Sequence, residues 1–307
     1  MTATFLRKSP GTRPRRPPWE EPPSPLGQGA KAVLLSLLVL SVLFPLWVIL
    51  VTSLSSRETI ARAGGLVVVP RGIDTSAYET IFAGGAVTRA LWISTLVTVI
   101  GTALALTVTV LAAYGLSRPR SLGYRWLLAY FLLPFLIYPP LVPKYLVVTG
   151  LGLKDTIWAL ILPPAISVFN LVVVRGFFQG IPSELVDSAR IDGASDFRTL
   201  TQIVLPLARA VIAVVGLFYA VSYWNVWFDA LLFIDRNDMY PIQRVLQSYL
   251  LAGQAPNTSG AAIGATMPPT EAIKMAVVVL TVAPIVAVYP FIQRHFVKGV
   301  LIGAIKG

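Results

Sequence analysis

Six long stretches of the chain are apolar on every face of a helix, with no alternation between apolar and polar positions. A helix needs about 20 mostly apolar residues to cross the hydrocarbon core of a bilayer. By that criterion the candidate spans are Ala32 to Leu54, Ala90 to Leu116, Trp126 to Val148, Thr156 to Val174, Ile203 to Phe228 and Ala272 to Ile292. The pattern predicts an all-α membrane protein with about six transmembrane helices.

Prolines interrupt two of these stretches. Pro163 and Pro164 fall in the fourth, and Pro284 and Pro290 in the sixth. Membrane helices tolerate proline kinks where neighbouring groups satisfy the freed carbonyls, so both stretches are retained as spans. Gly101, within the second stretch, is expected to permit close helix packing rather than to act as a hinge.

The basic residues predict the orientation of the spans. Of the 25 Lys and Arg, 16 fall in the N-terminal tail, the C-terminal tail and the connections that lie on the same side as the tails, and the remaining 9 fall in the other connections. Because Lys and Arg are retained on the cytoplasmic side, both termini are expected to be cytoplasmic. The expected organisation is a disordered, basic, proline-rich tail over residues 1–30, a transmembrane domain over 31–293 and a C-terminal tail over 294–307. Lys144, in the third span, is expected to extend toward the outer surface.

The composition excludes several classes of protein. Charged residues make up 13% of the chain, against roughly 25% in soluble domains. With no cysteine and one histidine, disulfides, thiol-ligated metals and histidine-rich metal sites are not expected. The net charge is +11, and the basic residues lie at the ends of apolar runs. We therefore expect a lipid bilayer rather than nucleic acid as the partner.

No catalytic residues are predicted. The chain lacks a phosphate-binding G-x-x-x-x-G-K-[ST] sequence, and one histidine without cysteine cannot supply a Ser/His/Asp or Cys/His set. If ATP drives this protein, another chain must bind it.

One charged segment, Ile181 to Arg198, joins the fourth and fifth spans. Ser183 is predicted to cap a short helix with Glu184 and Asp187 in its first turns. Their negative charges are stabilised there by the positive end of the helix dipole. Gly193 suits a left-handed residue that ends this helix. Ser195 or Asp196 can then cap a second short helix, giving two short helices with a glycine corner.

The apolar residues of this segment are Leu185, Ala189, Ile191 and Phe197. They are expected to form a small apolar knob between charged flanks. Charge alone is equally compatible with a solvated connecting loop.

The segment nevertheless resembles a known motif. The run Asp187-Ser188-Ala189-Arg190-Ile191-Asp192-Gly193-Ala194, with Phe197 and Leu205-Pro206 downstream, is similar to the cytoplasmic "EAA" loop of permease subunits in bacterial ATP-binding-cassette (ABC) importers. The chain departs from the usual pattern at Asp187, where glutamate is usual, and at Ser188, where alanine is usual. In that family the loop docks into a cleft on the ATPase subunit.

This resemblance implies a location, a set of partners and a coupling site. The partners are a second homologous permease, two ABC ATPase subunits that hold ATP and Mg, and an extracellular solute-binding protein, in the bacterial inner membrane. This chain itself would hold no cofactor. The implied ATPase-coupling residues are Glu184, Asp187, Ser188, Ala189, Asp192, Gly193, Ala194, Phe197, Leu205 and Pro206.

Other parts of the chain extend the resemblance. The closing Gln293 to Gly299 and Gly303 to Gly307 are similar to the C-terminal tail of maltose-type carbohydrate permeases. Leu217 to Val221, Trp224-Asn225 and Tyr240 to Gln243 resemble the branch associated with oligosaccharide uptake. The implied substrate is a carbohydrate.

Sugar chemistry offers a separate test, because sugars stack on aromatic rings and bond to amides and hydroxyls. Candidate substrate-pathway residues at the outer half of the fifth span are Tyr219, Tyr223, Trp224, Asn225 and Trp227. The alternative for these residues is an interfacial aromatic belt.

Two other classes of protein remain. An ion-coupled secondary transporter would be expected to show ionisable residues inside its spans and often inverted repeats, and neither is evident. A non-transporting membrane scaffold would leave the glycine-cornered loop unexplained.

Overall fold

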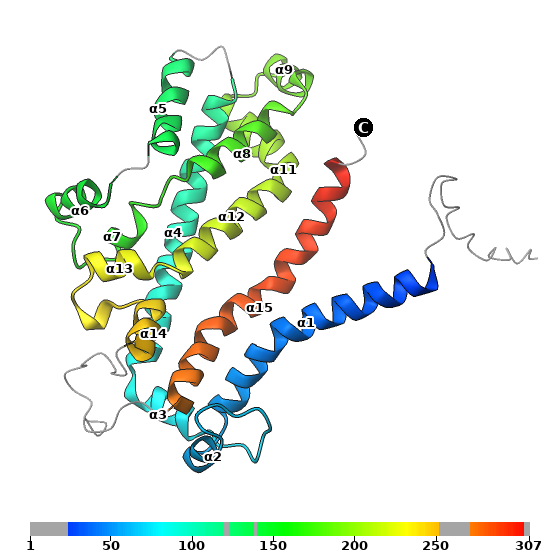
Figure 1. Ribbon diagram of the computed structural model, residues 1–307. Helices are drawn as coiled ribbons and strands as arrows, with labels where there is room; N and C mark the ends of the chain where they lie inside the picture. The colour runs from blue at the N-terminus through cyan, green and yellow to red at the C-terminus, as the bar shows by residue number, and fades with distance from the viewer. Residues whose placement is uncertain (1–23, 119–122, 138–139, 252–270, 304–307) are drawn as a thin grey trace, which may run out of the picture. The chain divides into compact units, whose positions relative to one another are not determined.

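The computed structural model describes residues 24–118, 123–137, 140–251 and 271–303 (Figure 1). Within these ranges every regular element is helical. Contacts divide the chain into two units, Met1–Trp47 and Val48–Gly307. Residues 1–23 of the predicted N-terminal tail and residues 304–307 of the predicted C-terminal tail lie outside the described ranges.

Helix α1, Pro25–Ser53, contains all but the last residue of the first predicted span and begins inside the predicted tail. Proline is tolerated in a first helical turn, because the amide hydrogen it lacks has no partner there. Only 6% of the most apolar window of α1 is buried. An apolar helix of 29 residues with an exposed surface is suited to contact with lipid.

The centre of the second unit is α4, Ala86–Leu116, a continuous helix of 31 residues. It packs most extensively against α12, Arg209–Trp224, and then against α8, Val168–Gln179. Helix α15, Glu271–Gly303, lies along α12 and contacts α14, Ile242–Leu251 (Figure 1).

Close packing of α4 on α12 depends on Gly101. A Cβ atom at this position would lie 2.8 Å from the ring of Tyr223, well inside van der Waals contact. Tyr223 is 1% exposed. The expectation that Gly101 permits close helix packing is therefore confirmed.

Three helices of the described residues are long and apolar enough to cross a membrane, or five if each of two bent pairs is one span. The first bent pair is α5, Tyr124–Leu136, with α6, Leu141–Gly150, and it extends two residues beyond each end of the third predicted span. The second joins Asp196–Leu207 to α12 through a bend of 86°. The apolar runs are confirmed, but these two are not straight helices.

The fourth predicted span, Thr156 to Val174, is not one helix. It divides into α7, Trp158–Ile161, and α8, which begins after the cap residue Ser167. Pro163 and Pro164 separate them, because proline supplies no amide hydrogen and its ring clashes with the preceding turn. The irregular segment between α7 and α8 becomes a wall of the cavity described below.

The remaining elements are short. They are α2 (Arg57–Arg62), α3 (Ser76–Gly84), α9 (Ser183–Ile191), α10 (Asp196–Thr199), the π-helix η1 (Leu200–Val204), α11 (Leu205–Leu207), α13 (Trp227–Phe233) and the 3₁₀-helix η2 (Asn237–Met239). Of these, α9 and α10 carry the predicted coupling segment.

Candidate functional site

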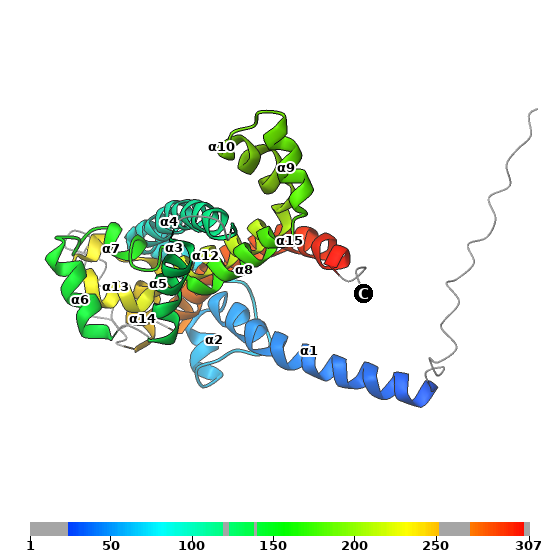
Figure 2. The same ribbon diagram turned by 90° about the horizontal axis from the view of Figure 1, so that it is seen from above.

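The segment between α8 and α12 folds as two short helices with a sharp corner, as predicted. We call Pro182–Thr199, which contains α9 and α10, the elbow; Figure 2 shows it projecting beside α4, α8 and α12. Gly193 has φ 78°, a left-handed conformation that glycine adopts without a Cβ clash. Its amide donates to the Arg190 carbonyl at 3.0 Å, and the Ala194 amide donates to the Ala189 carbonyl at 2.9 Å. These two bonds satisfy carbonyls that the helix end leaves free.

The caps of the two helices differ from the prediction at one end. The residue before α9 is Pro182, and Ser183 is the first helical residue, so the predicted cap by Ser183 is wrong. Proline fits that position because its fixed φ leads into a helix and it adds no unpaired donor. At α10 the Ser195 hydroxyl accepts from the Arg198 amide at 3.3 Å, which selects Ser195 over Asp196 as the cap.

The elbow exposes three large apolar side chains. Ile191 is 87% exposed, Phe197 70% and Leu185 44%. Ala189, expected in the same knob, is instead buried at 7% exposure. Leaving large apolar side chains in water is unfavourable, so these three are candidates for contact with another chain.

The predicted coupling residues fall into two groups. Those exposed on the elbow are Glu184, Asp187, Ser188, Asp192, Gly193 and Phe197, with Ala194 half-buried. Leu205 and Pro206 are half-buried in α11, after the π-helix, and do not belong to the elbow. Since Pro206 cannot donate a backbone hydrogen bond, the regular i→i−4 pattern is interrupted there.

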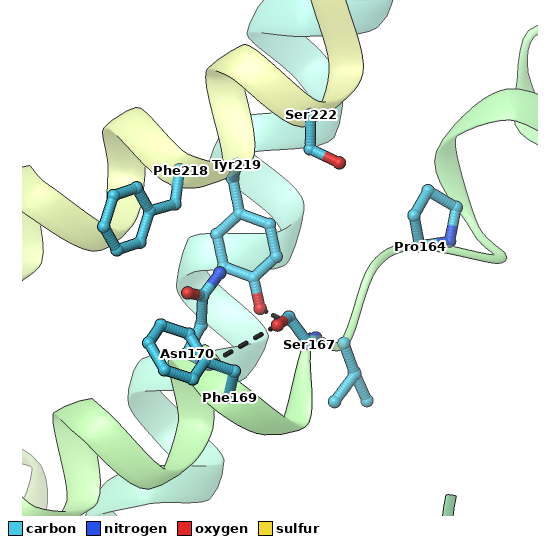
Figure 3. Close-up of a pocket in the computed structure, with 8 residues that line it drawn as sticks. Pro164, Ser167, Phe169, Asn170, Phe218, Tyr219 and Ser222 are labelled. Atoms are coloured by element: carbon cyan, nitrogen blue, oxygen red, sulfur yellow. Dashed lines mark hydrogen bonds between the residues drawn. The ribbon is translucent and has the colours of Figure 1, made fainter. Parts of the chain in front are cut away.

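A cavity of about 560 Å³ lies between α12 and the start of α8 (Figure 3). Its lining residues are Pro164, Ile166, Ser167, Phe169, Asn170, Phe218, Tyr219 and Ser222. The rings of Phe169 and Phe218 are tilted by 42° with centroids 6.3 Å apart, and Asn170, beside Phe169 and Tyr219, is buried. The cavity therefore combines aromatic surface with hydroxyl and amide groups.

Tyr219 is held in this cavity wall by two other elements. Its hydroxyl oxygen lies 2.6 Å from the Thr109 hydroxyl of α4 and accepts from the Ser167 amide at 3.0 Å. Both Thr109 and Tyr219 are buried. Among the five predicted substrate-pathway residues, Tyr219 is the one that lines this cavity.

Two of the other predicted pathway residues serve packing. The Tyr223 hydroxyl donates to the Ile161 carbonyl at 2.9 Å. The Trp224 indole donates to the Thr281 carbonyl on α15 at 3.1 Å, in a separate buried cluster. Neither side chain faces the cavity.

The last two pathway residues lie near α13 and α14. Asn225 donates to the Val221 carbonyl at 2.8 Å and accepts from Gln243 at 3.0 Å. Trp227 borders a smaller cavity of about 350 Å³, together with Gln243, Leu246, Gln247 and Leu250. The structure thus separates the predicted pathway set into three places.

Most of the residues around Tyr219 are not among the predicted pathway residues. Ser167, Phe169 and Asn170 come from the segment after Pro163-Pro164 that was predicted to be a continuous span. The signal available was the proline pair followed by a serine that can cap a new helix.

Lys144 forms an ion pair in the structure. Its ammonium group lies 2.6 Å from the Asp229 carboxylate, with side-chain exposures of 30% and 15%. It therefore links α6 to α13 as a partly buried ion pair, and its extension toward the outer surface stays a prediction.

Three comparisons place the chain among known proteins. The family model described as the binding-protein-dependent transport system inner membrane component matches residues 105–302. The polygalacturonan/rhamnogalacturonan transport system permease protein YtcP of Bacillus subtilis (strain 168) is 42% identical over 242 residues, covering 78% of this chain and 85% of the relative. The protein LplC of the same strain is 40% identical over 265 residues, covering 86% and 90%.

A solved structure agrees. A chain in the crystal structure of a bacterial ABC transporter involved in the import of the acidic polysaccharide alginate superposes with a TM-score of 0.82 at 27% identity. The match covers 91% of this chain and 100% of that chain.

The matched residues 105–302 include the elbow, the cavity and the C-terminal part of α4 from residue 105. This relationship argues against the two alternatives, an ion-coupled secondary transporter and a non-transporting membrane scaffold. It also excludes an enzymatic role, since the relatives are transport permeases. The chain belongs to the family of inner membrane components of binding-protein-dependent transport systems and is a permease subunit of an ABC importer.

Proposed function

We propose that this subunit forms half of the pathway by which a bacterial inner-membrane importer moves an oligosaccharide into the cell. A second homologous permease would form the other half, and an extracellular solute-binding protein would deliver the sugar. The carbohydrate transported by YtcP and that imported by the alginate transporter support this substrate class.

The observation that carries the substrate class is the chemistry of the cavity around Tyr219. Exposed faces of Phe169 and Phe218 suit the apolar faces of sugar rings. Asn170 and Ser222 can bond to sugar hydroxyls. The Tyr219 hydroxyl is already engaged by Thr109 and Ser167, so its role is to shape the wall.

The elbow is the proposed contact with the ATPase. Its exposed Ile191 and Phe197, flanked by Asp187 and Asp192, suit insertion of an apolar tip into a cleft with polar edges. Two ATPase subunits, which hold ATP and Mg, would be engaged by the elbows of the two permeases. The shorter side chain of Asp187 reaches less far than the usual glutamate, so its contribution to this contact is expected to be small.

The membrane arrangement follows from the same assignment. The elbow carries Arg190 and Arg198, and α4 and α8 bring Arg118 and Arg175 to the same end. Basic residues favour the cytoplasmic side, so we place this end and both termini in the cytoplasm. Six crossings result if α7 and α8 together make the fourth.

The sugar assignment is tested by uptake into liposomes that contain the complete importer. Oligosaccharides of neutral and acidic sugars are supplied with the solute-binding protein, and Asn170→Leu is compared with the parent. Loss of one hydrogen bond to a sugar hydroxyl costs about 0.5–1.5 kcal/mol, so we expect uptake efficiency to fall up to roughly tenfold.

The matched control is Asn225→Leu, which removes an amide outside the cavity. It should retain near-parental uptake. Equal uptake by the Asn170 variant and the parent, or equal loss in both variants, would contradict the assignment of the sugar to this cavity.

A further inference from the structure

Asp196 of the elbow bonds to Tyr114, in the last turn of α4, and to Arg118, two residues after α4 ends. The Arg118 guanidinium donates to the Asp196 carboxylate at 2.5 Å, and the Tyr114 hydroxyl donates to the Asp196 backbone carbonyl at 3.0 Å. We call Tyr114, Arg118 and Asp196 the joint. Since the two bonds engage different groups of Asp196, they restrain rotation as well as separation.

The α4 side of the joint is ordered by its own contacts. Arg118 lies 4.4 Å from the centroid of the Tyr114 ring and donates to the Tyr114 hydroxyl. The Tyr114 ring meets Phe178 of α8 edge to face, with centroids 6.4 Å apart. On the elbow side Asp196 is the first residue of α10, and Arg190 of α9 lies 3.7 Å from its carboxylate. The joint therefore holds both elbow helices to α4.

Helix α4 continues without a break from the joint to the cavity wall. Thr109 precedes Tyr114 by five residues, about 7.5 Å along a helix axis, and bonds to Tyr219. A displacement of the inner end of α4 is thus passed to the hydroxyl that shapes the cavity.

The covalent route from the elbow is less direct. After α10 the chain passes through a π-helix and a bend of 86° at Ala208 before it enters α12. Irregular helical turns of this kind absorb rotation, whereas a regular helix transmits it.

We propose that the joint is the rigid link through which movement of the elbow displaces α4 and reshapes the cavity at Tyr219. Tyr114, Arg118 and Asp196 are positioning residues in this account, because they touch neither substrate nor nucleotide. The inference rests on the proposed function, in which the ATPase holds the elbow.

The absence of cysteine in the chain makes the test direct. Ser222→Cys places the single cysteine of this chain in the cavity wall, and its labelling by a water-soluble maleimide is read by mass on this chain. The complete importer is labelled without nucleotide and after trapping with ATP and vanadate. With the joint intact, the labelling rate should differ between the two states.

Arg118→Gln and Asp196→Asn each break the ion pair. Coupling between two sites commonly changes the affinity at one of them by a factor of 5 or more. We therefore expect each change to reduce the difference in labelling rate between the two nucleotide states by about fivefold. The ATPase should still co-purify with both variants. The exchange Arg118→Asp with Asp196→Arg should restore part of the difference, which a merely structural defect would not allow. Arg62→Gln, which removes one partner of an exposed i,i+4 pair on α2, is the matched control.

Gly193→Val separates the two hypotheses, because it strains the elbow without touching the joint. Suppose that Gly193→Val abolishes the difference in labelling rate between the two nucleotide states, while Arg118→Gln and Asp196→Asn retain it in full. That result would overturn the proposed role of the joint and leave the role of the elbow in place. Full retention in Gly193→Val, with the ATPase bound, would overturn the proposed role of the elbow itself.

Discussion

The hydroxyl oxygens of Thr109 on α4 and Tyr219 on α12 lie 2.6 Å apart in a buried site, although 110 residues separate them in the chain. This contact connects α4, the central helix of the second unit, to the wall of the candidate sugar cavity. It also lies on the path from the elbow to that cavity. Its removal is therefore expected to affect both packing and transport.

Tyr219→Phe tests that contact. The change leaves the Thr109 hydroxyl and the Ser167 amide without their partner, and an unsatisfied buried polar group costs about 1–3 kcal/mol. We expect a lower melting temperature of the purified importer and slower sugar uptake. Tyr240→Phe, whose hydroxyl makes one exposed contact of 3.4 Å, should change neither. An unaltered melting temperature in Tyr219→Phe would show that the contact does not stabilise the helix pair.

Gly101→Ala tests the packing of α4 on α12. The added Cβ would lie 2.8 Å from the Tyr223 ring, and overpacking of this kind costs about 1–3 kcal/mol. Gly115→Ala is the matched control on the same helix, because its Cβ meets no atom within 4 Å. Alanine favours a helix over glycine by up to about 1 kcal/mol, so Gly115→Ala should preserve or raise the melting temperature. The same response in both variants would contradict the assigned packing.

Lys144→Met tests the link between α6 and α13. It leaves the partly buried Asp229 carboxylate without its cation, and we expect a loss of about 2 kcal/mol in stability. The double change Lys144→Met with Asp229→Leu should recover most of that loss, since neither charge then remains. Lys154→Met removes one partner of the more exposed pair with Asp235 and should lower the melting temperature much less. Strict additivity of the single changes at Lys144 and Asp229 would argue against a direct interaction.

The joint makes a prediction about pH. The hydrogen bond from Arg118 holds the pKa of Asp196 below its ordinary value of 3.8. A carboxyl whose pKa is lowered by folding stabilises the folded state above its unfolded pKa, and this contribution is lost as the pH falls through the lowered value. From about pH 5 to pH 8 Asp196 therefore stays charged. We compare the difference in labelling rate between the two nucleotide states in the parent with that difference in Asp196→Asn. The ratio of these two differences should be constant over this pH range. A change in the ratio near pH 6 would contradict the assignment.

Most of the backbone structure of the elbow could be predicted from residues that are close together in the sequence. The corner at Gly193 was predicted, and the second cap was narrowed to Ser195 or Asp196, because each depends on the backbone preference of one residue and on bonds to residues within five positions. The structure selected Ser195. The prediction of Ser183 as the cap was wrong because Pro182 occupies the cap position. Both residues are suitable at the start of a helix, and local backbone preference does not decide between two adjacent residues.

The substrate-pathway prediction shows where local sequence stops. Tyr219, Tyr223 and Trp224 share one helix. Tyr219 and Tyr223 are four positions apart and lie on nearly the same side of it, whereas Trp224 is turned by about 100° from Tyr223. What each side chain meets therefore depends on the neighbouring helices as well as on its position along α12. Tyr219 faces the cavity, whereas Tyr223 packs on Gly101 and Trp224 bonds to α15.

The sequence by itself determined that the chain is an apolar helical membrane protein and that its charged segment forms a two-helix elbow. Both properties come from the composition and backbone preferences of continuous stretches. Only the tertiary structure decided that Ser167 and Asn170 meet Tyr219, that Lys144 pairs with Asp229 and that Asp196 fastens the elbow to α4. These relationships join residues from separate helices, and their partners depend on how the helices pack, which apolar runs with similar surfaces do not specify.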